Sequence, residues 1–332
     1  MINKTLILSV ILATLMAVGL TSCNKGKKAA ASSVSGICKV ICDESFKNIL
    51  DEEIEVFEYT YKDANVLPRY MDEASALDSL LAEKTNLIIS YRDLTTNQKG
   101  ILRGQGRAFR SRRIAVDAVA LIVNKDNDID YLSMSDIKDI MTGKSTKWGQ
   151  VYPTKLKNDS IKVIFDQNRS GVVHYIKDTF NGGNDLPIQF YAQGSSQAVF
   201  DAVEKTRNAI GVIGVSWITS DMKSTATTVE EKYAQLQENT PPQETHFTDR
   251  IKVLGVRNDD KIKDYKPYQA YIYDGSYPLT REIFAIDASP LGTHDHDFFV
   301  FLTGSIGQKI ILQTGISPAS VPIRIVNVGG GN

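Results

Sequence analysis

The 332-residue sequence is poor in the residues that build metal sites and disulfide frameworks, with three cysteines and four histidines. A metal site usually needs histidine, cysteine or carboxylate ligands at a short, regular spacing. Only residues 293–297 (Thr-His-Asp-His-Asp) place two histidines close together, and they directly precede the apolar stretch 298–302. We interpret 293–297 as the polar start of a helix, although two metal-ligating histidines are the alternative. We expect neither a metal nor another cofactor.

The sequence also lacks an excess of charge of either sign. Its 38 basic and 39 acidic side chains leave a formal net charge of −1. Nucleic-acid-binding proteins usually gather basic residues in a block or on one face, and no such block is present. Gly-x-Ser-x-Gly turns, phosphate-binding P-loops and dinucleotide-binding glycine patterns are missing as well. The sequence therefore favours neither a nucleic-acid partner nor an enzyme; a phosphatase would need a base or metal that is not evident.

Long hydrophobic runs are absent except at the very start of the chain. Lys4 precedes an almost unbroken apolar run, 6–20, which leads into Leu20-Thr21-Ser22-Cys23. The run has the length of the hydrophobic region of a secretory signal and is short for a bilayer span. Small residues directly before a cysteine resemble the lipobox of bacterial lipoproteins. This resemblance implies diacylglycerol on the Cys23 sulfur, cleavage before Cys23 and acylation of the new amine.

The N-terminal pattern predicts a lipoprotein of a bacterial cell envelope that faces the periplasm. Residues 1–22 are the expected signal peptide, and 23–35, which contain almost no large apolar group, are the expected flexible tether. More than one acyl chain makes membrane anchoring stable. The alternative is an uncleaved anchor helix with an incidental cysteine.

Cys38 and Cys42 are the only thiols after the predicted cleavage site. They lie four residues apart in an expected strand, so their Cα atoms would be roughly 13 Å apart at about 3.3 Å per residue. A disulfide cannot close that distance unless the strand bends. We predict two buried free thiols.

Strand-like and helix-like segments alternate along the rest of the chain, which predicts α/β architecture with mainly parallel sheets. The chain is longer than one compact core usually needs, so we expect two lobes. The expected strands cover residues 36–41, 86–89, 114–123, 161–165, 188–191 and 209–217. The expected helices cover 46–57 and 133–141, with two more ending at Phe180 and near Lys205. The polar stretch 219–249 is interpreted as a surface excursion.

Three expected strand-to-helix turns, 43–45, 168–170 and 194–196, contain small or hydroxyl residues. The start of a helix leaves backbone N–H groups unpaired and has partial positive charge, so several such starts can bind an anion without a basic patch. Open α/β sheets bind ligands at the carboxyl ends of their strands. The alternative is that Ser45, Ser170 and Ser196 are ordinary helix caps.

Five stretches of the sequence resemble the extracytoplasmic phosphate-binding proteins of ABC importers. They are Ala-Val-Asp-Ala-Val-Ala-Leu-Ile-Val-Asn (115–124), the run 132–148 with Met-Thr-Gly-Lys and Trp148, Ala-Ile-Gly-Val-Ile-Gly (209–214), Tyr-Pro-Leu-Thr-Arg (277–281), and the tail with Gly-Gln-Lys (307–309) and Gly-Ile-Ser-Pro (315–318). The resemblance covers about residues 36–324.

The resemblance implies the two-lobed type 2 periplasmic-binding-protein fold, α/β with mainly parallel sheets and two crossing hinge strands at about 114–118 and 279–286. Lobe one would contain 36–115 plus 279–332, and lobe two 116–278. A monomer would bind inorganic phosphate between the lobes, and hinge closure would signal an ABC permease and ATPase complex.

The family's phosphate-contacting residues match this sequence in part. Ser45 and Phe46 match the first contact loop, Ser90 the second, and Ser170-Gly171 the Ser-Gly of the third. The remaining expected contacts are Ser75, a weaker match at a helix start, and the two guanidiniums nearest to the matched loops, Arg92 and Arg169.

Three positions depart from the family pattern. Val172 replaces a threonine, Asp166 replaces an arginine, and Tyr91 replaces the aspartate that accepts a proton from hydrogen phosphate. Asp93 is a candidate for that acceptor role. Two alternatives therefore stay open: a binding protein for another tetrahedral oxyanion, and an envelope oxyanion sensor or scaffold lipoprotein with the same fold.

Overall fold

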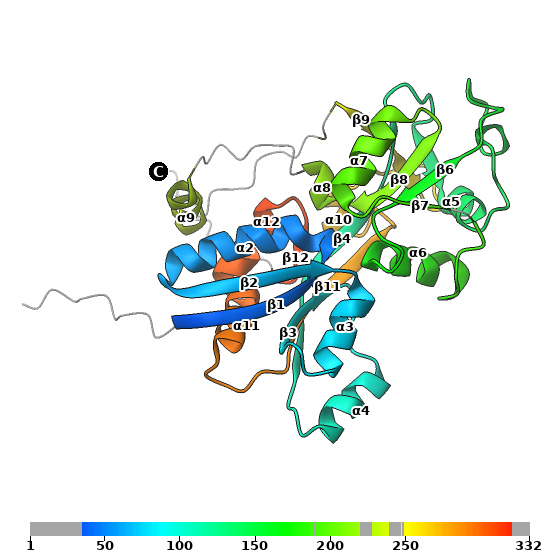
Figure 1. The fold of residues 1–332 in the computed structure, drawn as a ribbon. Helices are drawn as coiled ribbons and strands as arrows, with labels where there is room; N and C mark the ends of the chain where they lie inside the picture. The colour runs from blue at the N-terminus through cyan, green and yellow to red at the C-terminus, as the bar shows by residue number, and fades with distance from the viewer. Residues whose placement is uncertain (1–34, 189, 220–227, 239–246, 248, 321–332) are drawn as a thin grey trace, which may run out of the picture. The chain divides into compact units, whose positions relative to one another are not determined.

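The fold is organised around a sheet in which parallel strands flank two antiparallel ones (Figure 1). The two central strands are β4 (Arg110–Asn124) and β11 (Thr280–Asp287), which pair with each other in antiparallel register. The strand order is β2-β1-β3-β11-β4-β8-β6-β7. On the β11 side lie β1 (Ser35–Asp43), β2 (Asp63–Met71) and β3 (Leu87–Ser90); on the β4 side lie β8 (Ala209–Gly214), β6 (Lys162–Phe165) and β7 (Tyr191–Ala192).

Shorter strands complete the β structure. β9 (Ile251–Val253) and β12 (Ser317–Pro318) pair with β4, and β5 (Tyr131–Ser133) with β10 (Gly255–Arg257) forms a separate two-stranded sheet. β1 pairs in parallel with β2 and β3, and β6 pairs in parallel with β7 and β8. The predicted α/β architecture is confirmed, with parallel strands on both sides of the two central antiparallel ones.

The computed structural model describes residues 35–188, 190–219, 228–238, 247 and 249–320. All of them belong to one compact unit. Cys23, the predicted signal peptide and nearly all of the predicted tether lie outside the described residues. Among the helices that are described, none has both the length and the apolar character needed to cross a membrane.

The helices connect the strands and cover the sheet. Their bounds are η2 (Glu44–Phe46), α2 (Lys47–Thr60), α3 (Glu73–Leu81), α4 (Thr96–Gly104), α5 (Met134–Met141), η3 (Trp148–Gln150), α6 (Gly171–Asn181), α7 (Ser196–Lys205), α8 (Ser216–Thr219), α9 (Val229–Gln237), α10 (Gln269–Tyr273), α11 (His294–Thr303) and α12 (Ser305–Gln313). Most of the longer ones start at a side-chain cap, as polar residues at helix starts predict. In α6, for example, the Ser170 hydroxyl accepts a hydrogen bond from the backbone N–H of Val173, and Gly182 ends the helix in the left-handed conformation.

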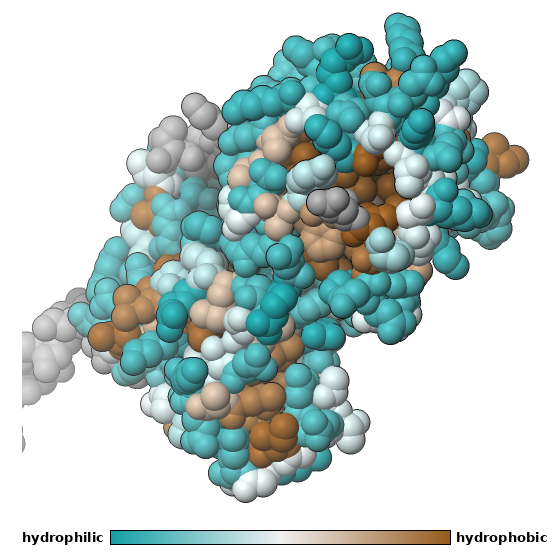
Figure 2. Space-filling model, turned by 45° about the vertical axis from the view of Figure 1, so that its right-hand side comes forward, coloured by the Kyte–Doolittle hydropathy of each residue, from teal (hydrophilic) through white to brown (hydrophobic). Residues whose placement is uncertain are grey.

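The main hydrophobic core lies around the central strands. In β4 every residue from Ala118 to Val123 is fully buried, because this strand has neighbours on both sides and helices against its faces. A continuous apolar run is typical of a strand in that position. On one outer face, seen in Figure 2, hydrophilic residues predominate, with smaller hydrophobic areas between them.

Several predicted elements differ from those observed. In place of the strand expected at 188–191, the structure has the two-residue strand β7, which pairs with β6 at the edge of the sheet. The strand expected at 209–217 ends at Gly214, and α8 follows. The helix expected at 46–57 begins as η2 and continues as α2 to Thr60. β2, α3 and α4 were not predicted, because their apolar residues are few or broken by polar ones.

Part of the polar stretch 219–249 forms helix α9. The Lys232 amine contacts the carboxylates of Glu52 and Glu55 on α2 at 2.8 and 2.6 Å, and the Tyr59 and Tyr233 rings lie 5.4 Å apart. Only Leu236 of α9 is buried. A helix attached mainly by its polar side chains has little apolar periodicity, so the sequence did not reveal it.

Two predictions about the rarer residues are confirmed. Cys38 and Cys42 are buried free thiols. Residues 293–297 form the polar start of α11, where the Thr293 hydroxyl caps the helix. His296 Nδ1 lies 2.8 Å from Oδ2 of the buried Asp287 on β11, so this histidine joins the helix to the sheet.

Candidate functional site

The three predicted turns meet at one buried polar site. The backbone N–H of Gly171, at the start of α6, donates to Asp43 Oδ2 over 2.8 Å. The backbone N–H and hydroxyl of Ser196, at the start of α7, lie 3.3 and 3.1 Å from Glu44 Oε2. The turn after β1 therefore touches two helix starts from the other side of the central strands. Figure 1 shows α6 and the start of α2 near the place where β4 and β11 run together.

Asp43 is at the centre of these contacts and is fully buried. Its Oδ1 accepts the backbone N–H of Ser45 over 2.9 Å and also the Ser45 hydroxyl, while its Oδ2 accepts the Gly171 N–H. Burial raises the pKa of Asp43 above its ordinary value; the nearby Arg281 guanidinium and the Ser45 hydroxyl offset part of this rise.

Arg281, on β11, supplies the one buried guanidinium of the site and is 3% exposed. It lies opposite Asp117 of β4 in the strand register, and its Nε and Nη2 donate to Asp117 Oδ2 over 3.0 and 2.8 Å. Nη2 also donates to the Ser45 hydroxyl oxygen over 3.1 Å, and the guanidinium carbon lies 4.3 Å from the centre of the Phe46 ring. Two central strands and the turn after β1 thus fix the position of this cation.

The other terminal nitrogen of the guanidinium, Arg281 Nη1, is buried and has no hydrogen-bond partner among the described residues. A side chain at Gly171 would bring its Cβ to within 3.3 Å of both Nη1 and Asp43 Oδ2. Nη1 therefore lies directly beside the start of α6. An unpaired guanidinium donor at a helix start is what an anion site requires.

Asp166 and Ser170 form the next part of the site, and both are fully buried. The Ser170 hydroxyl donates to Asp166 Oδ1, which also accepts the backbone N–H of Gln167 over 2.8 Å. Burial, with a further contribution from the Asp43 carboxylate, raises the pKa of Asp166 to about 7. Because a buried charge is unfavourable, the protonation equilibrium of Asp166 is shifted towards the protonated acid.

A second network surrounds Glu73 of α3, which is fully buried. Its Oε1 accepts the Ser90 hydroxyl over 2.7 Å, and its Oε2 lies 2.7 Å from His174 Nδ1 and 3.3 Å from Arg92 Nε. The Arg92 side chain is 39% exposed. Arg92 therefore lies at the rim, and its charge is already directed to Glu73.

The structure brings most of the expected contact residues together. Ser45 and Phe46 contact Arg281, Gly171 lies beside its Nη1, and Ser170 binds Asp166. Ser90 and Arg92 belong to the neighbouring Glu73 network. The last two expected contacts have other partners.

Those two are Ser75 and Arg169. The N–H and hydroxyl of Ser75 donate to Asp72, the cap of α3, over 3.0 and 2.8 Å. The Arg169 side chain is 56% exposed and lies 3.6 Å from Asp72 and 3.5 Å from Asp78. Both residues thus contribute to the edge where α3 meets the turn before α6.

The positions that depart from the family pattern do not restore the missing groups. The Tyr91 hydroxyl donates to Asp178 Oδ2 over 2.5 Å. Asp93, the candidate acceptor, binds the Lys99 amine at 2.6 Å. Val172 is buried in the core.

The sequence did not identify the most buried charged residues of the site. Asp43, Glu44, Glu73, Asp117 and Arg281 were not among the expected contacts, yet all are less than 9% exposed. One signal existed: Asp117 and Arg281 interrupt the apolar pattern of the two expected crossing strands. A charged residue inside such a strand is rarely buried unless it is paired.

The site has an excess of acidic groups. It contains five buried carboxyl groups, of Asp43, Glu44, Glu73, Asp117 and Asp166, but two guanidiniums, of which Arg281 pairs with Asp117 and Arg92 with Glu73. Burial raises the pKa values of Glu44 and Asp117 as well. The donors of the site are thus largely satisfied by acceptors of the same chain.

Relatives in sequence are distant but extensive. Residues 27–299 match the model of a family described as the PBP superfamily domain. The phosphate-binding protein PstS of Staphylococcus saprophyticus is 24% identical over 266 residues, which are 80% of this chain and 74% of that protein. The phosphate-binding protein PstS of Pseudomonas aeruginosa is 21% identical over 302 residues, 87% of this chain and 84% of that protein.

Solved structures resemble the chain over the same region. A putative phosphate ABC transporter substrate-binding protein from Clostridium perfringens, solved with bound phosphate, has a TM-score of 0.66 at 19% identity and covers 86% of this chain and 100% of its own. An ABC-type phosphate transport receptor from Vibrio cholerae has a TM-score of 0.60 at 16% identity and covers 85% of this chain and 100% of its own. With the family match extending over most of its length, the chain belongs to the PBP superfamily and has the two-lobed type 2 fold of periplasmic binding proteins.

Proposed function

We propose that this protein captures inorganic phosphate outside the cytoplasm and delivers it to the permease and ATPase of an ABC importer. The single observation on which the proposal rests is the buried Nη1 of Arg281 beside the start of α6, which has no hydrogen-bond partner within the described part of the chain. The relatives that are named as phosphate-binding proteins support the choice of ligand. The protein acts by binding and closure, without a chemical step.

The groups around Arg281 suit a tetrahedral oxyanion. A guanidinium offers two parallel N–H bonds, and the start of α6 adds backbone N–H groups and partial positive charge. The hydroxyls of Ser45 and Ser170 are within the same site. Phosphate would bind between two lobes, which we place at 36–115 plus 279–332 and at 116–278. The strand order, with β4 and β11 between the two parallel groups, supports this division.

We further propose that the mature protein begins at a lipidated Cys23 and acts as a monomer on the outer side of the membrane. The pattern Leu20-Thr21-Ser22-Cys23 supports the anchor. A tether of about a dozen residues would leave the two lobes free to move near the importer.

Calorimetry of the chain from residue 24 onward tests the ligand. We expect phosphate and arsenate to bind, and sulfate and molybdate to bind more weakly, because buried carboxylates reject anions that cannot donate a hydrogen bond. Ser45→Ala or Ser170→Ala should weaken phosphate binding by about 1 kcal/mol, since each removes one hydroxyl and leaves the backbone N–H groups. Ser79→Ala, in the last turn of α3, where the hydroxyl donates to the Ser75 carbonyl, is the control. Binding of sulfate as tight as that of phosphate would contradict the proposed ligand.

One observation favours a second candidate, an envelope sensor or scaffold that does not depend on phosphate. The N–H groups of Gly171 and Ser196, at two helix starts, already have carboxylate acceptors from the same chain. Absence of any oxyanion binding in the calorimetric experiment would support this candidate.

A further inference from the structure

We propose that the carboxylates of Asp43 and Glu44 occupy the place of the bound anion. They hold the site closed in the absence of ligand, and phosphate must displace them before it binds. We call these two side chains the carboxylate clasp. The inference rests on the proposed function where it concerns phosphate. The closing of the site without ligand is a separate claim with its own measurement.

The contacts of Asp43 are those that an oxyanion would make. Its two oxygens accept the backbone N–H and hydroxyl of Ser45 and the backbone N–H of Gly171. Ser45 follows β1 and Gly171 starts α6, so one carboxylate joins segments 128 residues apart. Each of these N–H groups has one hydrogen to give, so a phosphate oxygen in the same place would have to replace the carboxylate.

Glu44 repeats the arrangement at the next helix. Its Oε2 accepts both the backbone N–H and the hydroxyl of Ser196, at the first turn of α7. Adjacent carboxylates thus bind the starts of two helices of 11 and 10 residues. A negative charge at such positions is stabilising, because the helix start has partial positive charge.

The charges around the clasp oppose a second anion. Titratable and charged groups surround the clasp from several neighbouring elements. Those that interact with Asp43 are Cys42 on β1, Glu44 on η2, Glu73 on α3, Asp166 just after β6, and Arg281 on β11. Lys47 on α2 interacts with Glu44, Asp117 on β4 pairs with Arg281, and Tyr91 lies beside Gly171. Only Lys47 and Arg281 among them are cations, so phosphate would enter a site whose acidic groups outnumber its basic ones. Removal of the Asp43 charge relieves this repulsion and frees the donors.

The clasp also affects the equilibrium between open and closed forms. In a binding protein that closes on its ligand, the ligand's oxygens bridge the lobes; here the turn after β1 is bridged to α6 and α7 by the chain itself. If only a small fraction of molecules has the donors free, the apparent dissociation constant equals the intrinsic constant divided by that fraction, and is therefore larger. The clasp therefore lowers the affinity for phosphate while keeping the ligand-free protein closed.

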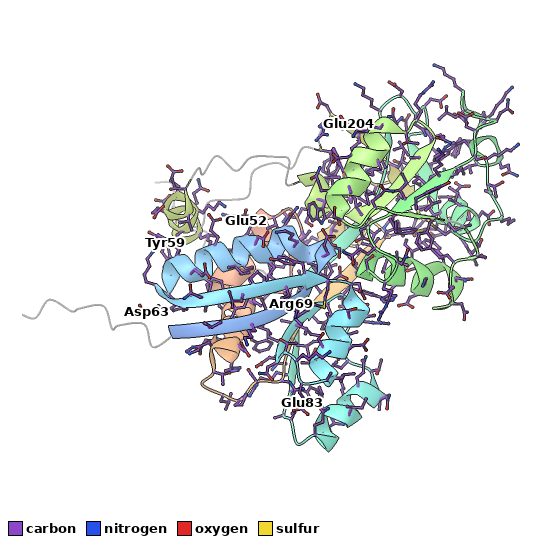
Figure 3. All side chains as sticks on the ribbon, in the orientation of Figure 1. Glu52, Tyr59, Asp63, Arg69, Glu83 and Glu204 are labelled. Atoms are coloured by element: carbon purple, nitrogen blue, oxygen red, sulfur yellow. The ribbon has the colours of Figure 1, made fainter. Side chains whose placement is uncertain are left out.

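Phosphate titrations of three variants test the competition. Asp43→Asn keeps the shape and removes the charge, whereas Asp43→Ala frees both N–H groups. We expect Asp43→Asn to bind phosphate about tenfold or more tightly than the parent, and Asp43→Ala at least as tightly. The matched control is Asp63→Asn, at the exposed far end of β2 (Figure 3), which should bind like the parent. Weaker binding by both Asp43 variants would overturn the inference, because Asp43 would then be a ligand contact.

A distance measurement tests closure without any ligand. Spin labels on Lys84→Cys, at the end of the α3 segment, and Asn158→Cys, in the exposed loop before β6, report the separation of two exposed positions. In the full chain without phosphate, we expect a narrow distance distribution for the parent and a broader, longer one for Asp43→Asn with Glu44→Gln. Phosphate should narrow the distribution of the double variant. Identical ligand-free distributions would overturn the inference.

The two measurements separate the inference from the proposed function. If the double variant opens and no chain binds phosphate, the clasp is real and the phosphate proposal fails. If all chains bind phosphate equally and the distributions are identical, phosphate is the ligand and the clasp fails. A melting curve for each variant ensures that an unfolded variant is not counted as an open one. The single variant Asp43→Asn, which is the mildest change, is measured in the same way.

Discussion

Glu53 is a buried acid that has no role in the site. It lies on α2, is 1% exposed, and neither carboxylate oxygen has a hydrogen-bond partner within the described part of the chain. It lines a small pocket with apolar neighbours that include Phe46, Ile114 and Ile311. Burial raises its pKa well above the ordinary value, with a smaller contribution from Glu52. The protonated acid is therefore the form that suits the folded protein.

Replacement of Glu53 should stabilise the protein. Glu53→Met keeps the length of the side chain and removes a polar group without a partner, so we expect the free energy of unfolding to rise by about 1–3 kcal/mol at pH 8. The gain should shrink as the pH falls, because a raised folded-state pKa means that the parent loses stability as the pH rises. Denaturant titrations at pH 5 and pH 8 measure this. Glu230→Met, at an exposed position of α9, is the control; a loss of stability in Glu53→Met at pH 8 would contradict this expectation.

Asp166 predicts a second pH dependence. Its pKa is raised from 3.8 to about 7 in the folded protein. The folded state therefore holds the proton more tightly, and the stability that this provides is present below about pH 4 and is lost as the pH rises to about 7. Asp166→Asn should abolish this loss. The free energy of unfolding of the variant, relative to that of the parent, should therefore increase between pH 4 and pH 8 by an amount on the order of a few kcal/mol. A constant difference across this range would show that Asp166 titrates normally.

At the scale of elements, β4, β8 and β11 fit closely around one ion pair. Gly214 ends β8, and a Cβ there would lie 3.1 Å from Arg281 Nη2 and 3.2 Å from Asp117 Oδ2. These distances are shorter than ordinary van der Waals contact. The absence of a side chain at Gly214 thus allows the guanidinium and the carboxylate to meet inside the sheet.

A pair of glycine substitutions tests this packing. Gly214→Ala should lower the free energy of unfolding by about 1–3 kcal/mol, because the extra methyl group displaces the ion pair. Gly100→Ala, in the middle of α4, should raise it by about 0.5–1 kcal/mol, because the new Cβ would meet no described residue beyond its chain neighbours and the backbone of its own helix. Chemical denaturation of both variants measures the difference. Equal effects would mean that β8 can move away from Arg281 without loss.

At the scale of the whole molecule, the membrane attachment that we propose would depend on Cys23, which lies outside the described residues. Cys23→Ser should abolish acylation, because serine lacks the sulfur that receives the diacylglycerol, and the protein should be unprocessed or released. Labelling with radioactive palmitate and fractionation of cells measure both effects. Cys38→Ser is the control, since Cys38 is a buried thiol of β1; unchanged labelling of Cys23→Ser would refute the lipobox interpretation.

Local patterns in the sequence were enough to determine much of the fold. The apolar run of β4, the serine cap of α6 and the polar start of α11 depend on neighbouring residues, so they could be recognised without the tertiary structure. The absence of a disulfide between Cys38 and Cys42 followed from their spacing in a strand. The turns that contain Ser45, Ser170 and Ser196 were also recognised, because small and hydroxyl residues after a strand are typical of helix starts.

Only the tertiary structure decided which acceptor each of these donors binds. Asp43 meets Gly171 across 128 residues, Glu44 meets Ser196 across 152, and Arg281 meets Asp117 across 164. In the sequence, Asp43 and Glu44 look like ordinary acidic residues at a helix start, and Arg92 looks like the nearest cation. Helix and strand patterns arise from neighbours along the chain, whereas the pairing of buried charges depends on which strands the sheet places side by side.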